Sequence, residues 1–201
     1  MTDALRGVLD APLGVEGDTA LRLRDVPMAQ RLTELRFELP ACDANDAAIS
    51  PAALARAFRD HPGGALAGDA MMRYADRVAA LGFRPLRGFL AGAIDLVARH
   101  DGKWWLLDYK SNRLGARRAD YGAERMAQEM ADAHYVLQYH LYAVALHRWL
   151  SLRVPGYDWD RDVGGACYVF LRGLGEGTGV FVDRPPRARI EALDRVLREG
   201  T

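Results

Sequence analysis

The stretch GFLAGAIDLVARHDGKWWLLDYKSNRLG, residues 88–115, decides the fold. Apolar and polar residues alternate on either side of a central turn, which predicts two antiparallel strands. Asp101-Gly102 tolerates the positive φ angles of a two-residue type I′ turn. This turn places His100 opposite Lys103, and the same register continues along both strands.

Two aspartates face each other in this predicted hairpin. The register puts Asp95 opposite Asp108, with Cβ atoms about 5 Å apart, and Lys110 follows on the same face. Two ionised carboxylates among apolar neighbours would repel each other and cost several kcal/mol in desolvation. Because Mg²⁺ and Mn²⁺ prefer carboxylate oxygens, the pair predicts a divalent-cation site beside Lys110. A solvated strand edge with an ordinary ion pair is the alternative, which the apolar context disfavours.

The composition is that of one ordinary globular domain. With 201 residues the chain can bury one sizeable core, and no apolar run approaches the roughly 20 residues of a membrane span. Cys42 and Cys167 lack metal-ligand spacing, so we expect a reducing, cytoplasmic setting. The formal net charge is zero, which neither announces nor excludes a nucleic-acid partner. A basic patch is expected just beyond the hairpin, formed by Lys103, Lys110, Arg113, Arg117 and Arg118.

The rest of the chain predicts an α/β domain with a mixed sheet. Strands are expected at residues 31–40, 166–172 and 179–182, and helices at 51–58 and 69–81. A helical region covers residues 121–150 with a bend near Asp132, and a last amphipathic helix closes the chain. Residues 1–30 are interpreted as an N-terminal remnant or partly ordered segment, and residues 31–201 as the folded domain.

Gln138 and Tyr142 are four residues apart on the predicted helix, so both side chains can point to one neighbour. They could hold the active-site lysine, a metal-bound water or a phosphate, or they could belong to a tyrosine-lined core helix. The spacings of His134, His140 and His147 do not match a helical zinc site. His134 is a candidate phosphate contact, and the other two are predicted to be surface or interface residues.

An ordered set of segments resembles the PD-(D/E)xK nuclease superfamily, and within it the RecB-like nucleases, the C-terminal nuclease domains of exodeoxyribonuclease V beta subunits. The set comprises GFLAGAIDL, DYKSNRLG, the helix with LQYHLY, GGACYVFLRG and GVFVDRP. The resemblance implies a restriction-endonuclease-like mixed central sheet flanked by helices. It also implies a magnesium-dependent nuclease acting on DNA in double-strand break repair and recombination.

The resemblance further implies roles for single residues. Asp95 and Asp108 would bind the metal with the backbone carbonyl of Tyr109, and Lys110 would be the catalytic lysine. Mg²⁺ is the implied ion, Mn²⁺ a substitute and Ca²⁺ an inhibitor. DNA binding or support of the site falls to Gln138, Tyr142, Ser111, Asn112 and Arg113. The implied partners are DNA, RecC-like and RecD-like subunits, a RecB-type helicase portion and RecA.

RecB-like nucleases also carry a metal-binding histidine in a GTxxHxxxE-like segment upstream of the first strand. None of the five histidines has such a context, and the chain has no Walker-type GxxxxGK[ST] motif. We therefore expect a fragment of a longer protein or a shortened relative. The alternative function is a weak or inactive nuclease-fold module that binds DNA or recombination proteins. A restriction or repair endonuclease is a third hypothesis, which the segments ACYVFLRG and LQYHLY disfavour.

Overall fold

The structure is a computed structural model that describes residues 3–13, 21–42, 48–83, 88–175 and 177–200. The chain forms two compact units, each made of three segments. Unit 1 comprises residues 1–35, 94–139 and 158–184, and unit 2 comprises residues 36–93, 140–157 and 185–201. Within the described ranges, no helix is long and apolar enough to cross a membrane.

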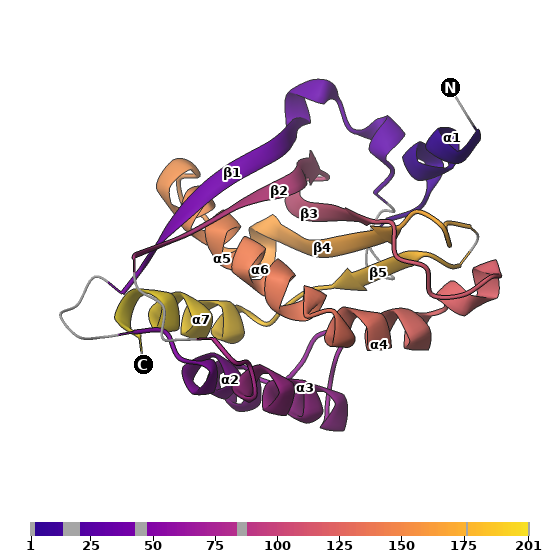
Figure 1. Cartoon of the computed structure of the whole chain (residues 1–201). Coiled ribbons are helices and arrows are strands. Elements are labelled where there is room, and N and C mark those ends of the chain that lie inside the picture. The colour runs from indigo at the N-terminus through magenta and orange to yellow at the C-terminus, as the bar shows by residue number, and fades with distance from the viewer. Residues whose placement is uncertain (1–2, 14–20, 43–47, 84–87, 176, 201) are drawn as a thin grey trace. The chain divides into compact units, whose positions relative to one another are not determined.

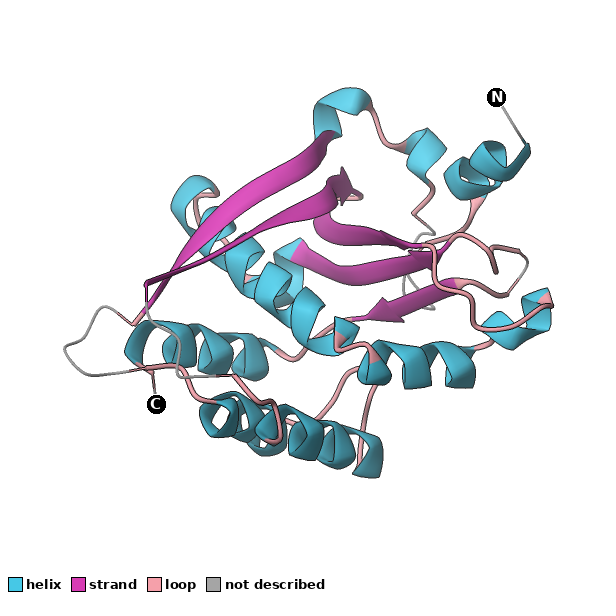
Figure 2. Cartoon of the chain, in the orientation of Figure 1, coloured by secondary structure: helices cyan, strands magenta, loops and turns pink. Residues whose placement is uncertain are grey.

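The strands form one mixed sheet in the order β1-β2-β3-β4-β5 (Figures 1 and 2). The β2–β3 and β4–β5 pairs are antiparallel, and β3 and β4 are parallel. The predicted mixed α/β fold is confirmed. The strand bounds are β1 Arg31–Ala41, β2 Gly88–His100, β3 Lys103–Lys110, β4 Val163–Phe170 and β5 Val180–Asp183.

Helices and short 3-10 turns connect these strands. The α-helices are α1 Asp3–Asp10, α2 Pro51–Asp60, α3 Asp69–Ala79, α4 Ala123–Asp132, α5 Tyr135–Arg153, α6 Trp159–Asp162 and α7 Arg187–Glu199. The 3-10 turns are η1 Leu23–Asp25, η2 Met28–Gln30 and η3 Arg118–Tyr121. Residues 14–20 of the predicted N-terminal segment lie outside the described residues, whereas α1, η1 and η2 are formed.

Alternation along β3 separates the two faces of the sheet in unit 1. Trp105 and Leu107 join a core with Cys167 and Val169 of β4 and with Leu23 of η1. The intervening residues of β3 point to the other face, because side chains of a strand alternate. Asp108 and Lys110 therefore lie on the face opposite this core.

Helix α5 begins after a sharp break in the backbone. His134 has a φ of 55°, in the left-handed region, and it separates α4 from α5. The predicted bend near Asp132 is confirmed. The helix direction changes at this break, and the first turn of α5 places Tyr135 and Gln138 next to Lys110 of β3.

Unit 2 contains helices α2, α3 and α7 beside the end of β1 and the start of β2. The Ser50 hydroxyl accepts a hydrogen bond of 3.1 Å from Ala53 N and caps α2, with Pro51 at the first helical position. Phe58 of α2 packs edge-on against Tyr74 of α3, with ring centroids 5.5 Å apart. The predicted last helix is α7, and its apolar face is buried through Ile190, Leu193, Val196 and Leu197.

Candidate active site

The predicted hairpin forms with the predicted register. Asp101 and Gly102 have φ angles of 49° and 77°, and the pairs run from His100↔Lys103 to Leu96↔Leu107. Asp95 and Asp108 come next in this register, just past the last pair of the ladder. Asp95 Oδ2 accepts a hydrogen bond of 3.0 Å from the Tyr109 backbone N–H, so it reaches across to β3. The two aspartates thus lie where β2 and β3 stop pairing.

Burial distinguishes the two aspartates. Asp108 is only 4% exposed, whereas Asp95 is exposed to solvent. The expectation that both carboxylates are embedded among apolar residues is therefore wrong for Asp95. The paired register of β2 with β3 ends at Leu96, and the Asp95 side chain reaches solvent. Burial raises the pKa of Asp108, the Lys110 ammonium opposes this rise, and the Asp95 carboxylate adds to it.

Lys110 is held in one place by charge, a hydrogen bond and aromatic rings. Its Nζ lies 2.7 Å from Asp108 Oδ2 and donates a hydrogen bond of 3.0 Å to Gln138 Oε1. The same Nζ lies 4.0 Å from the ring centroid of Tyr135 and 5.0 Å from that of Tyr168. Such cation–π contacts are worth about 2 kcal/mol when desolvated, and the lysine side chain is only 12% exposed. These five residues form the lysine cage.

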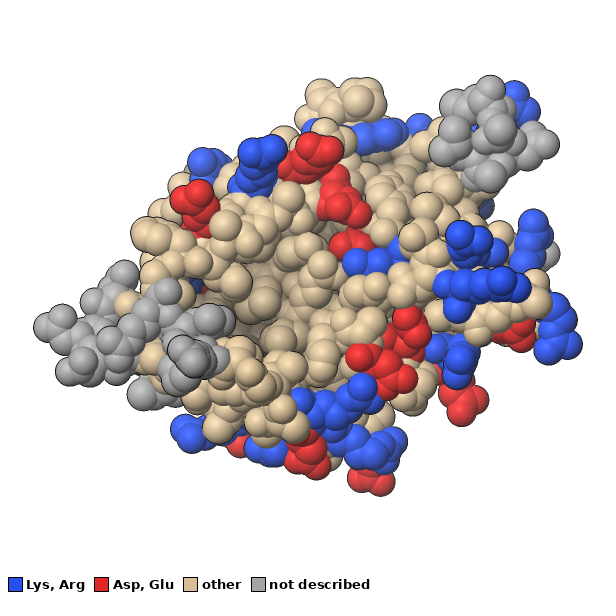
Figure 3. Space-filling model, in the orientation of Figure 1, with Lys and Arg blue, Asp and Glu red and all other residues tan. Residues whose placement is uncertain are grey.

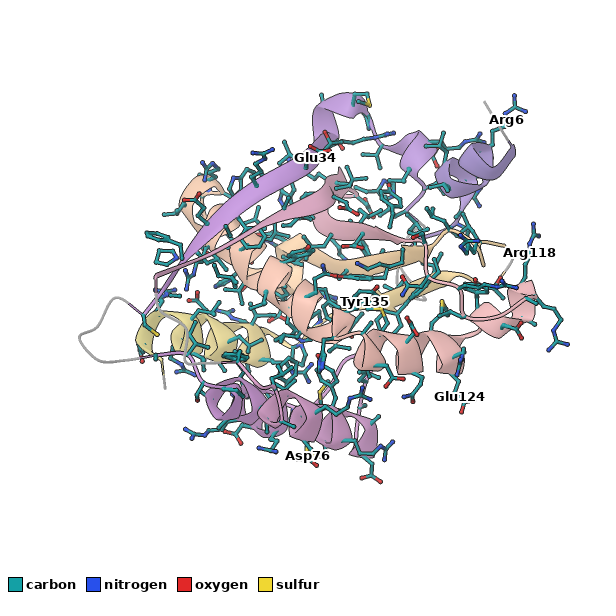
Figure 4. The ribbon with its side chains drawn as sticks, in the orientation of Figure 1. Arg6, Glu34, Asp76, Arg118, Glu124 and Tyr135 are labelled. Carbon is teal, nitrogen blue, oxygen red and sulfur yellow. The ribbon has the colours of Figure 1, made fainter. Side chains whose placement is uncertain are left out.

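Three elements build the lysine cage. Asp108 and Lys110 share a face of β3 because they are two residues apart, and Tyr168 pairs with Asp108 in the parallel β3–β4 register. The Tyr168 hydroxyl donates a hydrogen bond of 3.0 Å to Gln138 Oε1. Tyr135 extends from the first turn of α5, as Figure 4 shows. Gln138 thus accepts from both strands and fixes α5 over them.

Tyr142, one helical turn beyond Gln138, lies in the part of α5 that belongs to unit 2. Its ring packs edge-on against Phe37 of β1, with centroids 5.7 Å apart. Gln138 contacts Lys110, and Tyr142 packs in an aromatic pair with Phe37. Of these two helix residues, Gln138 therefore contacts Lys110 directly, and a role for Tyr142 at the site stays a prediction.

The residues after β3 tie the cage to its surroundings. Asn112 Nδ2 donates to Glu129 Oε1 at 2.7 Å, and the Tyr135 hydroxyl donates to Asn112 Oδ1 at 3.1 Å. Asn112 therefore holds the tyrosine that covers Lys110. The backbone carbonyl of Ser111 accepts a hydrogen bond from Arg172, and Arg113 is exposed.

The carboxylates retain capacity for a cation. Asp108 Oδ2 is buried and close to Lys110 Nζ, yet it accepts no well-aligned hydrogen bond within the described residues. One Asp95 oxygen accepts from Tyr109 N, and a carboxylate offers further lone pairs. Two carboxylates with spare acceptor capacity suit a hard divalent ion, which needs only one or two of them. Among the residues that the structure describes, no group of three His, Cys, Asp or Glu forms a fuller ligand set.

Two expectations about charged side chains are wrong. His140 is fully buried and lies 3.2 Å from Arg189 Nη1, so it is neither a surface nor an interface residue. Lys103 does not share a patch with Lys110, because the two residues occupy opposite ends of β3, about 23 Å apart at 3.3 Å per residue.

A mostly apolar pocket of about 520 Å³ adjoins the site on the Asp95 side. Asp95, Tyr109 and Arg31 lie among its lining residues, together with apolar side chains of α1 and η1. Arg31 is held in place because its Nε donates to the Val26 carbonyl at 2.9 Å and its Nη2 donates to the Leu23 carbonyl.

Tyr168, Tyr135 and Glu129 are the site residues that sequence reasoning missed. Tyr168 lies inside an apolar run whose parallel register with β3 no local pattern specifies. Tyr135 belongs to the predicted helical region 121–150, and only the tertiary structure places its ring beside Lys110. Side-chain alternation along β4 is the one sequence signal that could have indicated Tyr168. It puts Tyr168 and Phe170 on the same face of the strand.

Comparisons with known proteins identify the family of the chain. Residues 18–200 match the family model of the PD-(D/E)XK nuclease superfamily. The chain is 41% identical to the RecBCD enzyme subunit RecB of Mycobacterium tuberculosis over 98% of its length, and 35% identical to that of Escherichia coli K12 over 98%. It is 51% identical to the Haemophilus influenzae subunit over 59% of its length. The chain spans 19%, 16% and 10% of these relatives, respectively. With a matched family model, a mixed sheet and a D-x-K strand, the chain belongs to the PD-(D/E)XK nuclease superfamily.

Proposed function

We propose that this chain is a magnesium-dependent deoxyribonuclease domain. Asp95, Asp108 and the Tyr109 carbonyl would hold the ion, with Mn²⁺ as a substitute and Ca²⁺ as an inhibitor. The observation that carries the proposal is the lysine cage, which keeps an ammonium 2.7 Å from a buried carboxylate. A cage of this kind has a clear use in phosphodiester hydrolysis, where negative charge develops on the phosphate.

Each residue of the site has a role in the proposed hydrolysis. A bound Mg²⁺ would lower the pKa of a water and stabilise charge on the phosphate. Lys110 offers a point charge and hydrogen-bond donors to a phosphate oxygen or to the attacking water. Gln138, Tyr135 and Tyr168 keep that ammonium at the end of β3, so little reorganisation is needed when the phosphate arrives.

The identity of the relatives extends the proposal to a larger assembly. The similar proteins are named RecBCD enzyme subunit RecB. We infer that the chain serves as the nuclease domain of a RecB-like exodeoxyribonuclease V in double-strand break repair and recombination. DNA, RecC-like and RecD-like subunits and a helicase portion are the partners in this proposal. RecA is not included, since the relatives' names give it no support.

A nuclease assay on linear single- and double-stranded DNA with Mg²⁺ tests the proposal. We expect Asp108→Asn and Lys110→Met each to lower the cleavage rate at least about 100-fold, a typical loss for one group that stabilises transition-state charge. The matched control is Lys103→Met, which removes a lysine from the opposite end of the same strand and should retain the rate within about twofold. Wild-type cleavage rates in both site variants would contradict the site assignment.

A DNA-binding module without strong cleavage is the second candidate. The Asp108–Lys110 ion pair favours this second function, because Lys110 neutralises the buried carboxylate without any added ion. Wild-type protein that binds DNA but leaves it intact with Mg²⁺ and with Mn²⁺ would support this module.

A further inference from the structure

Four exposed arginines lie on two segments that follow the strands carrying the lysine cage. Residues 111–122 contribute Arg113, Arg117 and Arg118, and residues 171–179 contribute Arg172. The acidic residues in these segments are Asp120 and Glu176, so their formal net charge is +2 in a chain whose total is zero. Glu176 lies outside the described residues. We call the four side chains the arginine surface.

Hydrogen bonds and one close ring contact join the two segments. Arg172 Nε donates a hydrogen bond of 2.8 Å to the Ser111 carbonyl, and Gly179 N donates one of 3.1 Å to the Tyr121 carbonyl. The Tyr121 ring packs directly on Gly173, where an added Cβ would lie 2.0 Å from the ring. A residue larger than glycine would clash with Tyr121 at this position, so the contact between the segments requires Gly173.

The arginines remain available for an anion. Asp120 Oδ2 accepts a hydrogen bond of 2.8 Å from Arg117 N, so this carboxylate shapes the loop. The Arg117 guanidinium itself lies 3.4 Å from Asp120 and is 83% exposed. Exposed pairs of this kind contribute about 1 kcal/mol or less, and a phosphate can replace them.

The segments that carry the arginine surface begin next to the lysine cage. Leu171 N donates a hydrogen bond of 3.0 Å to the carbonyl of Lys110, so the arginine-bearing turn starts beside the cage lysine. In Figure 3, Lys and Arg atoms gather on the right of the visible face, and Figure 4 shows Arg118 pointing away from the ribbon there.

We propose that the arginine surface binds backbone phosphates of the DNA strand that flanks the cleaved bond. Guanidinium groups bind phosphate oxygens in a bidentate manner, and such contacts position the strand without reading its sequence. The inference rests on the proposed function for the position of the cleaved bond, and it adds the path of the substrate. DNA binding through this surface can be measured without cleavage.

The test measures binding of fluorescein-labelled single-stranded and duplex DNA by anisotropy in EDTA, between about 50 and 200 mM NaCl. Arg117→Gln/Arg118→Gln is compared with Arg187→Gln/Arg195→Gln, which removes the same charge from exposed positions of α7. We expect the first variant to raise Kd about tenfold and to flatten the log K against log salt slope by about 1.5, as two lost phosphate contacts require. The control should bind within about twofold of wild type.

A cleavage assay with Mg²⁺ separates this inference from the proposed function. If the wild type cleaves, the arginine variant should raise KM about tenfold and keep kcat within about twofold, because it weakens binding and leaves the lysine cage intact. If the wild type fails to cleave while the variant still loses binding, the proposed function fails and the arginine surface stands. Equal losses of DNA affinity in both double variants, or an unchanged salt slope in the arginine variant, would contradict the proposed DNA contact. The arginines would then bind another partner, such as an acidic protein.

Discussion

Lys110 shows how much of a site depends on the neighbours of one residue. An isolated lysine at a strand end would sample many rotamers and lose about 2 kcal/mol of entropy when fixed. Here the ion pair, the Gln138 hydrogen bond and two aromatic rings oppose that cost. The contribution of the Tyr135 ring can be tested by itself, because the ring and its hydroxyl can be removed in separate variants.

Replacing Tyr135 separates the ring from its hydroxyl. Tyr135→Leu removes the ring that lies 4.0 Å from Lys110 Nζ, and we expect kcat to fall about tenfold, equivalent to about 1.4 kcal/mol. Tyr135→Phe keeps the ring and loses only the bond to Asn112, so kcat should stay within about threefold. Steady-state cleavage kinetics check both variants. Equal losses in the two would contradict the cation–π role.

The two cysteines should react differently with thiol reagents. Cys167 is fully buried in β4, and burial raises its pKa to about 12, so almost no thiolate exists at neutral pH. Cys42 is half-buried. In native protein we expect an Ellman-type reagent to modify Cys42 and to leave Cys167 unmodified, whereas both react in denaturant. Mass spectrometry of the modified peptides identifies the site, and fast native labelling of Cys167 would contradict its burial.

At the scale of elements, alternation and helix geometry decide which side chains meet. Strand β3 sends Trp105 and Leu107 into the core and Asp108 and Lys110 to the opposite face. Helix α7 in unit 2 shows the same principle with a charged residue. Arg189 is fully buried, donates to the carbonyls of His61 and Gly63 at 2.8 Å each, and lies 5.5 Å from the Phe58 ring.

Arg189 should therefore stabilise unit 2 much more than its neighbour Arg187. Arg189→Met removes the buried guanidinium that donates to two partly buried carbonyls, and we expect the free energy of unfolding to fall by about 3 kcal/mol. The matched control Arg187→Met removes an exposed pair with Glu191 in the same helix and should cost less than about 1 kcal/mol. Urea denaturation gives both values. Similar losses in the two variants would contradict the role assigned to Arg189.

For the whole molecule, a bound ion should appear as added stability. A ligand that binds only the native state stabilises it by about 2.7 kcal/mol at 100 times its Kd. We expect saturating Mg²⁺ to raise the Tm of the wild type, and Asp108→Asn to abolish most of the increase. Differential scanning calorimetry with Mg²⁺ and with EDTA measures the effect. An increase that persists in Asp108→Asn would place the ion elsewhere.

Local patterns already contained much of the fold. The Asp-Gly turn, the Ser50-Pro51 helix start and the bend near Asp132 depend on neighbouring residues, and the structure has all three. The exposure of Asp95 was not predictable in this way, because it depends on where β2 stops pairing with β3. The burial of His140 depends on Arg189, which lies 49 residues further along the chain.

The sequence by itself determined the hairpin register, the mixed α/β architecture and the D-x-K arrangement of Asp108 and Lys110. These features follow from side-chain alternation and turn chemistry, which act over a few residues. Only the tertiary structure decided that Tyr168, Tyr135 and Gln138 surround Lys110. Their approach depends on the parallel register of β3 with β4 and on the direction of α5 after His134. Both are set by packing between residues far apart in the chain, and no local preference specifies them.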